Sequence, residues 1–436
     1  MSTFDDILPR LTEIFTRSAD MIHPFAPLLI NRDLNGRVRL IAGEQWQGDG
    51  QAAAVLDKIT REMQDALGSH AYPADQALMF DSGIENEVRR AYGFPLVGTE
   101  GVYVVERLAT EVSWSSISPP SSTTPRLVFY SVKGGVGRST GMAVSAWSLA
   151  EKGKRVLVLD LDLESPGLSS SLLPEDRRPA YGIADWLVED LVNNGDAVFG
   201  GLVASSALSH DGEILVVPAH GVAAGEYVAK LGRVWMPKIT GDRNRESWSG
   251  RLQRLLRELE DQWRPDVTLI DSRAGIDEVA AACLTGLSAS GILLFAIDGD
   301  QTWTGYRMLL RHWRTTAVVR EIRERLQIVG AMLPDTGTEE YFEGLREHAW
   351  DVFSEELYDE VPPGEMASED GIWNFEKTDL SAPHYPWGVR WHRGFAALND
   401  LHSRLHRVDP DEIRAVFGPL VDGVQFAVDA SDQESP

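Results

Sequence analysis

Short runs of apolar residues alternate with amphipathic segments along the chain from residue 126 onward. The runs are LVFYS, RVLVLDLD, EILVVP, VTLID, GILLFAID and LQIVGAML, which begin at Leu127, Arg155, Glu213, Val267, Gly291 and Leu326. The intervening segment at residues 251–263 has leucines at helical spacing. Strands that are apolar on both faces and alternate with helices are typical of a parallel sheet covered on both sides. The pattern therefore predicts an α/β fold with a doubly wound, mostly parallel sheet.

The first part of the chain follows a different pattern. Residues 5–19 have helical apolar spacing, and residues 28–43 read as two strands around an Asn35-Gly36 turn. A helix is predicted at residues 52–67 and a strand at residues 101–114. These elements predict a small α+β domain without a recognisable chemical motif. We interpret it as an input, interaction or dimerisation module rather than a second active site.

Composition changes mark the boundaries between these parts. The segment SWSSISPPSSTTP at residues 113–125 collects Ser, Thr and Pro without apolar periodicity, which favours a linker. We therefore divide the chain into a small α+β domain at residues 1–112, this linker, and a larger α/β domain at residues 126–427. The polar end at residues 428–436 is predicted to be a disordered tail.

Composition and charge argue against several classes of protein. With 436 residues, two domains are expected, and 43% hydrophobic with 25% charged residues is ordinary for a globular protein. There is no apolar run long enough to cross a bilayer and no basic, apolar start typical of an export signal, so we expect no membrane insertion and a cytoplasmic location. Cys283 is the single cysteine, which excludes an internal disulfide and a Cys-rich metal site. The net charge of −25 makes contact with nucleic acid unlikely.

A glycine-rich loop follows the strand that ends at Ser131. Its residues are Lys133, Gly134, Gly135, Val136, Gly137, Arg138, Ser139 and Thr140, and a helix rich in Ala, Met and Leu comes next. The order of strand, glycine loop and helix suits phosphate, because glycines let backbone N–H groups converge on an anion at a helix N-terminus. The sequence therefore predicts a phosphate-binding loop here.

This loop resembles the deviant Walker A motif of the ParA/MinD-like (SIMIBI-class) P-loop ATPases, in the variant that reads KGGVGR. Three further segments look like family motifs in the family's order: the second-strand signature at residues 156–168, the strand at residues 214–221, and the Walker B strand at residues 267–275. The resemblance extends from Arg126 to just beyond residue 400. It implies ATP and Mg²⁺ as ligands and a homodimer that forms on ATP binding.

The resemblance also implies a role for individual residues. Lys133 takes the position whose ammonium group reaches the partner subunit's nucleotide, although an ordinary solvated loop lysine is the alternative. Ser139 supplies a hydroxyl to Mg²⁺ or simply caps the helix, and Thr140 lies near the α-phosphate. Asp162, close to Asp160 at the end of the second strand, orients the attacking water. Asp271 ends a buried strand and holds Mg²⁺ through water, which makes Lys133, Asp162 and Asp271 the expected catalytic set.

Arg138 departs from the usual family residue, which is lysine. Guanidinium is planar and larger than an ammonium group but binds phosphate well, so we expect nucleotide binding with slow hydrolysis. In the loop after the Walker B strand, Arg273 and Asp277 suit a structural ion pair as well as a sensing role.

Two sheet ends are the candidates for recognition of the base. The sheet ends LFAIDGDQTWTG and VGAMLPDTG fall where the family places adenine contacts, but Pro334 and Asp335 stand where asparagine is frequent. ATP rather than GTP therefore follows from the resemblance alone. His384, in an aromatic-rich stretch, is interpreted as a packing residue rather than a catalyst.

Missing features separate the functions that share this fold. A single cysteine argues against the relatives that use cysteine pairs, and we see neither a basic patch for DNA, nor a basic amphipathic C-terminal helix, nor a C-terminal tyrosine cluster. We expect a slowly hydrolysing dimeric switch that regulates an unidentified protein partner or attached module, by analogy in bacterial signalling or phage defence. The alternatives are a nucleotide-binding scaffold that does not hydrolyse ATP and a partition or positioning ATPase.

Overall fold

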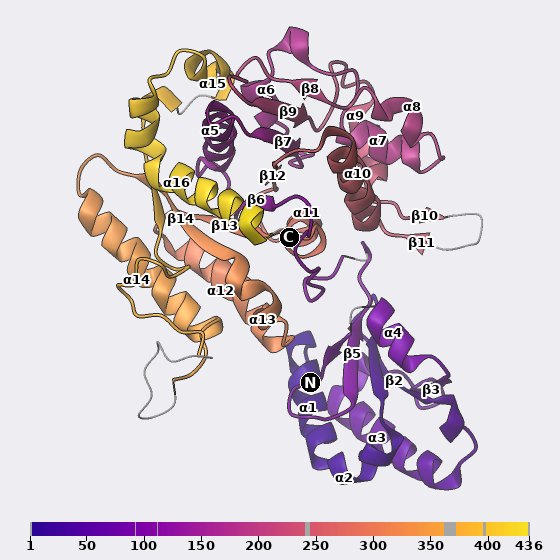
Figure 1. Ribbon diagram of the computed structural model, residues 1–436. Helices are drawn as coiled ribbons and strands as arrows, with labels where there is room; N and C mark the ends of the chain where they lie inside the picture. The colour runs from indigo at the N-terminus through magenta and orange to yellow at the C-terminus, as the bar shows by residue number, and fades with distance from the viewer. Residues whose placement is uncertain are drawn as a thin grey trace. The chain divides into compact units, whose positions relative to one another are not determined.

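The computed structural model describes residues 2–91, 93–110, 112–239, 245–361, 372–395 and 398–434. The chain forms two compact units (Figure 1). The first comprises Met1–Ser116 with His312–Val319, and the second comprises Ile117–Arg311 with Arg320–Pro436. The division after Ser116 falls inside the segment that we predicted to be a linker.

The first unit is an α+β module. Within its described residues, five strands form a sheet in the order β3-β2-β1-β5-β4, namely Leu78–Asp81, Val38–Gly43, Leu28–Arg32, Val102–Glu106 and Phe94–Pro95. Helices α1 (Ile7–Arg17) and α3 (Gly50–Leu67) supply the main core on one face, while α4 (Ile84–Arg90) packs on a smaller cluster that includes Leu29 and Val105. The short α2 is Ala19–Ile22.

Local interactions explain two of these elements. The turn between β1 and β2 is closed by the Asp33 carboxylate, which accepts 2.9 Å hydrogen bonds from the backbone N–H groups of Asn35 and Arg37, and Gly36 supplies its φ of +78°. Strand β5 is shorter than the predicted 101–114 and ends at Glu106, opposite Arg32, the last residue of its neighbour β1.

The second unit confirms the predicted doubly wound, mostly parallel α/β fold. Eight of its described strands form one sheet in the order β15-β14-β13-β6-β12-β7-β9-β8, with every neighbouring pair parallel except β8 and β9. The strands are Trp387–Arg390, Leu326–Leu333, Gly291–Ala296, Arg126–Ser131, Val267–Asp271, Arg155–Asp160, Glu213–Val217 and Ala204–Ser205. Strands β10 (Lys238–Ile239) and β11 (Arg245–Glu246) form a separate hairpin.

Helices cover both faces of this sheet. On one face, α5 (Arg138–Glu151) and α16 (Pro410–Glu434) lie beside each other and share a core with alternate residues of the central strands (Figure 1). On the other face, α12 (Asp300–Thr315) places Tyr306 against Tyr130, and Glu260 of α10 (Trp248–Trp263) bonds to Thr268 of β12. The remaining helices are α6 Leu168–Leu172, α7 Ile183–Asp190, α8 Gly195–Phe199, α9 Tyr227–Val234, α11 Glu278–Ala281, α13 Val319–Ile322, α14 Thr338–Glu356 and α15 Leu398–Leu405.

The end of the chain corrects one expectation. The predicted disordered tail begins at residue 428, but α16 continues to Glu434. Val428 is fully buried in the core that α16 shares with α5, and this apolar contact extends the helix beyond the point where the sequence becomes polar. Ser435 and Pro436 lie outside the described residues. In the described part of the chain, no helix has both the length and the apolar character that a bilayer span requires.

Candidate functional site

The glycine loop joins the end of β6 to the start of α5. Gly135 and Gly137 have φ angles of +75° and +80°, a left-handed conformation that residues with a Cβ atom rarely adopt. Gly137 is the N-cap residue, so α5 begins directly at Arg138. The first N–H groups of a helix lack partners within the helix and bear a partial positive charge, which makes this end of α5 suited to an anion.

Carboxylates gather at the same edge of the sheet. Strand β12 pairs with β6 and β7 on its two sides, and Asp271 is in register with Asp160 at the ends of β12 and β7. Asp162 follows two residues after Asp160. Both Asp160 and Asp271 are almost completely buried. Because parallel strands end at one edge, the fold brings these acids to the beginning of α5.

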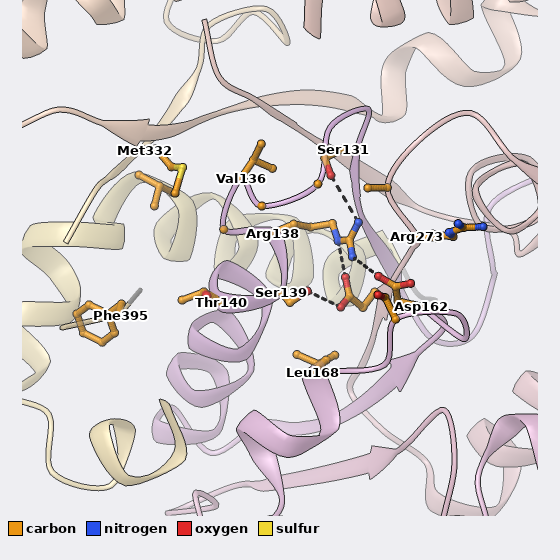
Figure 2. A pocket seen from close by; sticks show the side chains of 18 of the residues that line it. Ser131, Val136, Arg138, Ser139, Thr140, Asp162, Leu168, Arg273, Met332 and Phe395 are labelled. Atoms are coloured by element: carbon orange, nitrogen blue, oxygen red, sulfur yellow. Dashed lines mark hydrogen bonds and ion pairs between the residues drawn. The ribbon is translucent and has the colours of Figure 1, made fainter. Parts of the chain in front are cut away.

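Arg138 connects these acids to the glycine loop (Figure 2). Its Nε donates a 2.6 Å hydrogen bond to Oδ1 of Asp271, and one terminal nitrogen lies 3.4 Å from Oδ2 of Asp162. The other terminal nitrogen lies 3.5 Å from Ser131 Oγ. Arg138 therefore bridges the ends of β6 and β12 and the residues that follow β7.

The surroundings of Arg138 make this link strong. Burial alone would lower the pKa of Arg138, but the negative charges of Asp271 and Asp162 outweigh burial and raise that pKa above its ordinary value. Burial also raises the pKa of Asp162, and Arg138 offsets part of this effect. Breaking a buried ion pair by removing one partner costs about 3–5 kcal/mol, because the other charge stays buried.

Ser139 and Asp271 form the second contact of the site. The Ser139 Oγ donates a 2.8 Å hydrogen bond to Oδ2 of Asp271, the carboxylate oxygen that Arg138 Nε does not use. A hydroxyl and a carboxylate at this distance are oxygen donors of the kind that Mg²⁺ prefers. The residues present therefore fit a divalent cation.

A second arginine joins the loops that follow β7 and β12. Arg273 lies 2.7 Å from a carboxylate oxygen of Glu164 and 3.2 Å from one of Asp277. Asp277 also caps α11, where it accepts a 2.9 Å hydrogen bond from the N–H of Ala280. Burial raises the pKa of Asp277, opposed by that hydrogen bond and by Arg273. Glu164 and Arg273 are partly exposed, and exposed pairs contribute only about 0–1 kcal/mol.

Arg138, Ser139, Asp162, Glu164, Asp271 and Arg273 all line one cavity of about 590 Å³, whereas Asp160 and Asp277 lie outside its wall. The phosphate-loop side consists of Gly134, Gly135, Val136, Gly137, Arg138, Ser139 and Thr140, with Asp162 and Asp271 beside them. Another part of the wall is apolar and aromatic and is built by Met332, Val389, Trp391, Phe395 and Phe417. Figure 2 shows Met332 and Phe395 at the end opposite Arg273. A cavity of this size, apolar at one end and charged at the other, suits a small molecule with a ring and an anionic group.

Sequence reasoning missed most of the apolar wall. Of the two sheet ends expected near the base, the second contributes Met332, whose φ of +57° coincides with a register shift between β14 and β15. In the first of these sheet ends, Oδ1 of Asp298 instead accepts a 2.8 Å hydrogen bond from Trp303 Nε1 and lies 2.8 Å from His348 Nδ1. Val389 and Trp391 of this wall come from the aromatic-rich stretch near residue 390, whose aromatic content was the one available signal, whereas Phe417 comes from α16.

Lys133 lies apart from the residues that line the cavity. It is exposed at the start of the glycine loop, whereas Gly134 and the following loop residues face the cavity. Two other residues singled out in the sequence are internal. His384 is fully buried, with Nδ1 2.5 Å from the Tyr358 hydroxyl, which agrees with a packing role. Cys283 is buried too, and burial raises the pKa of its thiol to about 12.

Comparison with known proteins gives one family match. The family described as "CobQ/CobB/MinD/ParA nucleotide binding domain" matches residues 127–363, more than half of the chain. A search among curated proteins found no match.

Several solved structures resemble the chain at low identity. Among them are pNOB8 ParA bound to nonspecific DNA (18% identity, 72% of this chain and 100% of that chain, TM-score 0.42) and a ParA family ATPase from Chlorobium tepidum TLS (16%, 69% and 99%, 0.43). A third is cobyrinic acid a,c-diamide synthase from Mycobacterium smegmatis with bound ATP analog and magnesium (22%, 55% and 86%, 0.36). Because all three TM-scores are below 0.5, function must be argued from the family match and the site.

Proposed function

The chain belongs to the CobQ/CobB/MinD/ParA nucleotide-binding domain family, and from this premise we propose that it is an ATP-dependent switch. In this proposal ATP and Mg²⁺ bind the cavity at the start of α5, hydrolysis is slow, and the nucleotide state controls a homodimer. The dimer in turn regulates a protein partner or an attached module, for which the first unit is the candidate within this chain.

One observation carries the proposal. The glycine loop, the N-terminus of α5, and the side chains of Ser139, Asp271 and Asp162 line a single cavity. The loop's backbone N–H groups and Arg138 would bind phosphates, while the apolar wall with Met332 and Phe395 would receive the base. ATP rather than GTP follows from the family resemblance.

The site offers a role for each polar group. Ser139 and Asp271 would hold Mg²⁺, which supplies positive charge to the phosphates. The Oδ1 atom of Asp162 is buried and accepts no hydrogen bond within the described residues, so it is the carboxylate oxygen that we assign to the attacking water. Lys133, exposed and outside the cavity wall, would act on the nucleotide of the partner subunit.

A second candidate function has a specific observation in its favour. Arg138 is held by Asp271 and Asp162, which are the two acids expected to serve Mg²⁺ and water. If this arrangement persists with nucleotide bound, the protein is a nucleotide-binding scaffold that does not turn over. Catalysis requires groups to be placed within about 1 Å of their working positions. Whether Arg138 keeps its contacts with Asp271 and Asp162 when nucleotide binds therefore decides between the switch and the scaffold.

The test measures both ATP hydrolysis and the molar mass of the protein in solution. Phosphate release from purified protein would be measured with ATP and Mg²⁺, and the molar mass would be determined by light scattering with ATP and with ADP. The switch predicts slow release and a doubled mass in ATP alone. A dimer in ATP without phosphate release supports the scaffold. Equal masses in both nucleotides contradict a nucleotide-controlled dimer.

A further inference from the structure

Positive charge is unevenly distributed around the cavity. Three arginines line it: Arg138, Arg273 and Arg390. Arg390 ends β15, where it pairs with Leu333 next to Met332, so it belongs to the apolar end. Only Arg138 and Arg273, among the arginines that line the described cavity, stand with the carboxylates at the phosphate end. A terminal phosphate adds negative charge beside Asp162 and Asp271, and an arginine of this wall can offset that charge together with Mg²⁺.

Arg138 is poorly suited to respond to that additional charge. It is buried, paired with Asp271 at 2.6 Å and with Asp162 at 3.4 Å, and close to Ser131 Oγ. If its guanidinium left these partners, two carboxylates would remain at least partly buried without their cation, and this is a large penalty. Arg138 also stands on the glycine loop itself, so every nucleotide with phosphates meets it.

Arg273 is held far more weakly. Its side chain is about one-third exposed (34%), and its partner Glu164 is more exposed still (45%). The contact with Asp277 is an i,i+4 ion pair at 3.2 Å, and Asp277 keeps its helix-capping hydrogen bond without Arg273. Exposed ion pairs are weakened by solvent and salt, so moving Arg273 to a new anion carries a small penalty.

The ion pair between Arg273 and Glu164 joins two loops of the cavity. Glu164 lies two residues after Asp162, and Arg273 lies two residues after Asp271. The Arg273–Glu164 pair therefore ties the loop after β7 to the loop after β12. When Arg273 leaves Glu164, that tie is lost, and both loops line the same cavity.

We propose that Arg273 is the residue that distinguishes ATP from ADP in this cavity, by exchanging Glu164 for the terminal phosphate. This inference rests on the proposed function and adds to it the residue that reads the nucleotide state. The differential contact is what any nucleotide switch requires, because a ligand shifts an equilibrium only through unequal affinity for its two states.

The test compares affinities for ADP and for a non-hydrolysable ATP analogue, both with Mg²⁺, by calorimetry on the full chain. Arg273→Gln should bind ADP like the wild type and lose about tenfold to a hundredfold in affinity for the analogue, the loss expected for one hydrogen bond to a charged group. Glu164→Gln should do the opposite, with a gain of about twofold to fivefold for the analogue alone, because the competing carboxylate charge is gone.

Arg390→Gln is the matched control, since it removes a cavity arginine at the apolar end and should change both affinities by the same factor. Equal effects of Arg273→Gln on ADP and analogue, or no effect on either, overturn the inference. If Arg273→Gln does not fold, Glu164→Gln decides, and an unchanged analogue-to-ADP ratio in that variant overturns it too. A wild-type protein that binds neither nucleotide contradicts the proposed function itself, which is a separate outcome.

Discussion

Asp271 uses its two carboxylate oxygens for two different partners, and the shorter contact is the 2.6 Å hydrogen bond from Arg138 Nε. The other oxygen accepts the hydroxyl of Ser139 at 2.8 Å. Asp271 thus neutralises a buried cation and orients a candidate Mg²⁺ ligand at the same time. Changing Asp271 should therefore affect folding and metal dependence together, whereas changing Ser139 should affect mainly metal dependence.

Asp271→Asn should lower the free energy of unfolding by about 3 kcal/mol, because Arg138 loses its closest buried partner, and should abolish the Mg²⁺ dependence of ATP binding. Ser139→Ala should also lose the Mg²⁺ dependence, but its free energy of unfolding should fall by only about 1 kcal/mol or less, the typical net value of one hydrogen bond. Urea titration gives the free energy of unfolding, and calorimetry with and without Mg²⁺ gives the Mg²⁺ dependence of ATP binding. Equal stabilities of the two variants would contradict the importance of the Arg138–Asp271 pair.

The part of the site that is contiguous in sequence could be predicted. The glycine loop is read from eight consecutive residues, and Asp271 from its place at the end of a buried apolar strand. Such local patterns carry their own physical reason: glycine adopts the loop's left-handed φ angles far more readily than residues with a Cβ atom, and a continuous apolar run suits a strand covered on both sides.

The contacts between distant segments could not be predicted. Arg138 and Asp271 lie 133 positions apart in the chain, so nothing local indicates that this arginine faces acids. Strand β15 was missed for a similar reason. It has four residues at the edge of the sheet and is recognisable as a strand only by its pairing with β14. The tail was misjudged because the burial of Val428 depends on its tertiary contacts.

Binding of ATP and Mg²⁺ should stabilise the folded protein. A ligand that binds the folded state only adds about 2.7 kcal/mol at a hundredfold excess over its Kd. We expect a rise in Tm with ATP and Mg²⁺ and a smaller rise with ATP and a chelator, because Ser139 and Asp271 then lack their cation. A Tm that does not respond to millimolar ATP and Mg²⁺, in protein verified to be free of nucleotide, would exclude this cavity as the binding site.

Acid should destabilise the protein through His384. Its Nε2 lies 3.2 Å from the carbonyl of Lys377 and must donate, so Nδ1 accepts from the Tyr358 hydroxyl. This neutral, buried imidazole has a pKa below its ordinary value because of burial, which the bond to Lys377 and the charge of Asp379 offset only in part. The unfolded chain therefore takes up the proton more readily than the folded one.

The stabilising contribution of His384 is complete above the unfolded pKa of about 6.5 and declines as the pH falls below it, by at most about 1.4 kcal/mol per pH unit. His384→Gln keeps one acceptor and one donor without a titrating group. The wild type should therefore lose more stability than His384→Gln between pH 7 and pH 5 in urea titrations. Parallel losses in the two proteins would show that His384 does not cause the acid sensitivity.

Lys133 should be needed for the dimer and not for nucleotide binding. It is exposed at the first position of the glycine loop and does not line the cavity, whereas Arg138 does. In a two-fold dimer one residue type acts at both sites, so a single substitution disables both. Lys133→Ala should therefore keep its affinity for ATP and lose both ATP-dependent dimerisation and phosphate release. Lys152→Ala, which removes another exposed lysine at the far end of α5, should behave like the wild type. Sedimentation velocity with ATP and Mg²⁺ makes the comparison, and a Lys133→Ala protein that dimerises as well as the wild type would reduce Lys133 to a solvated loop residue.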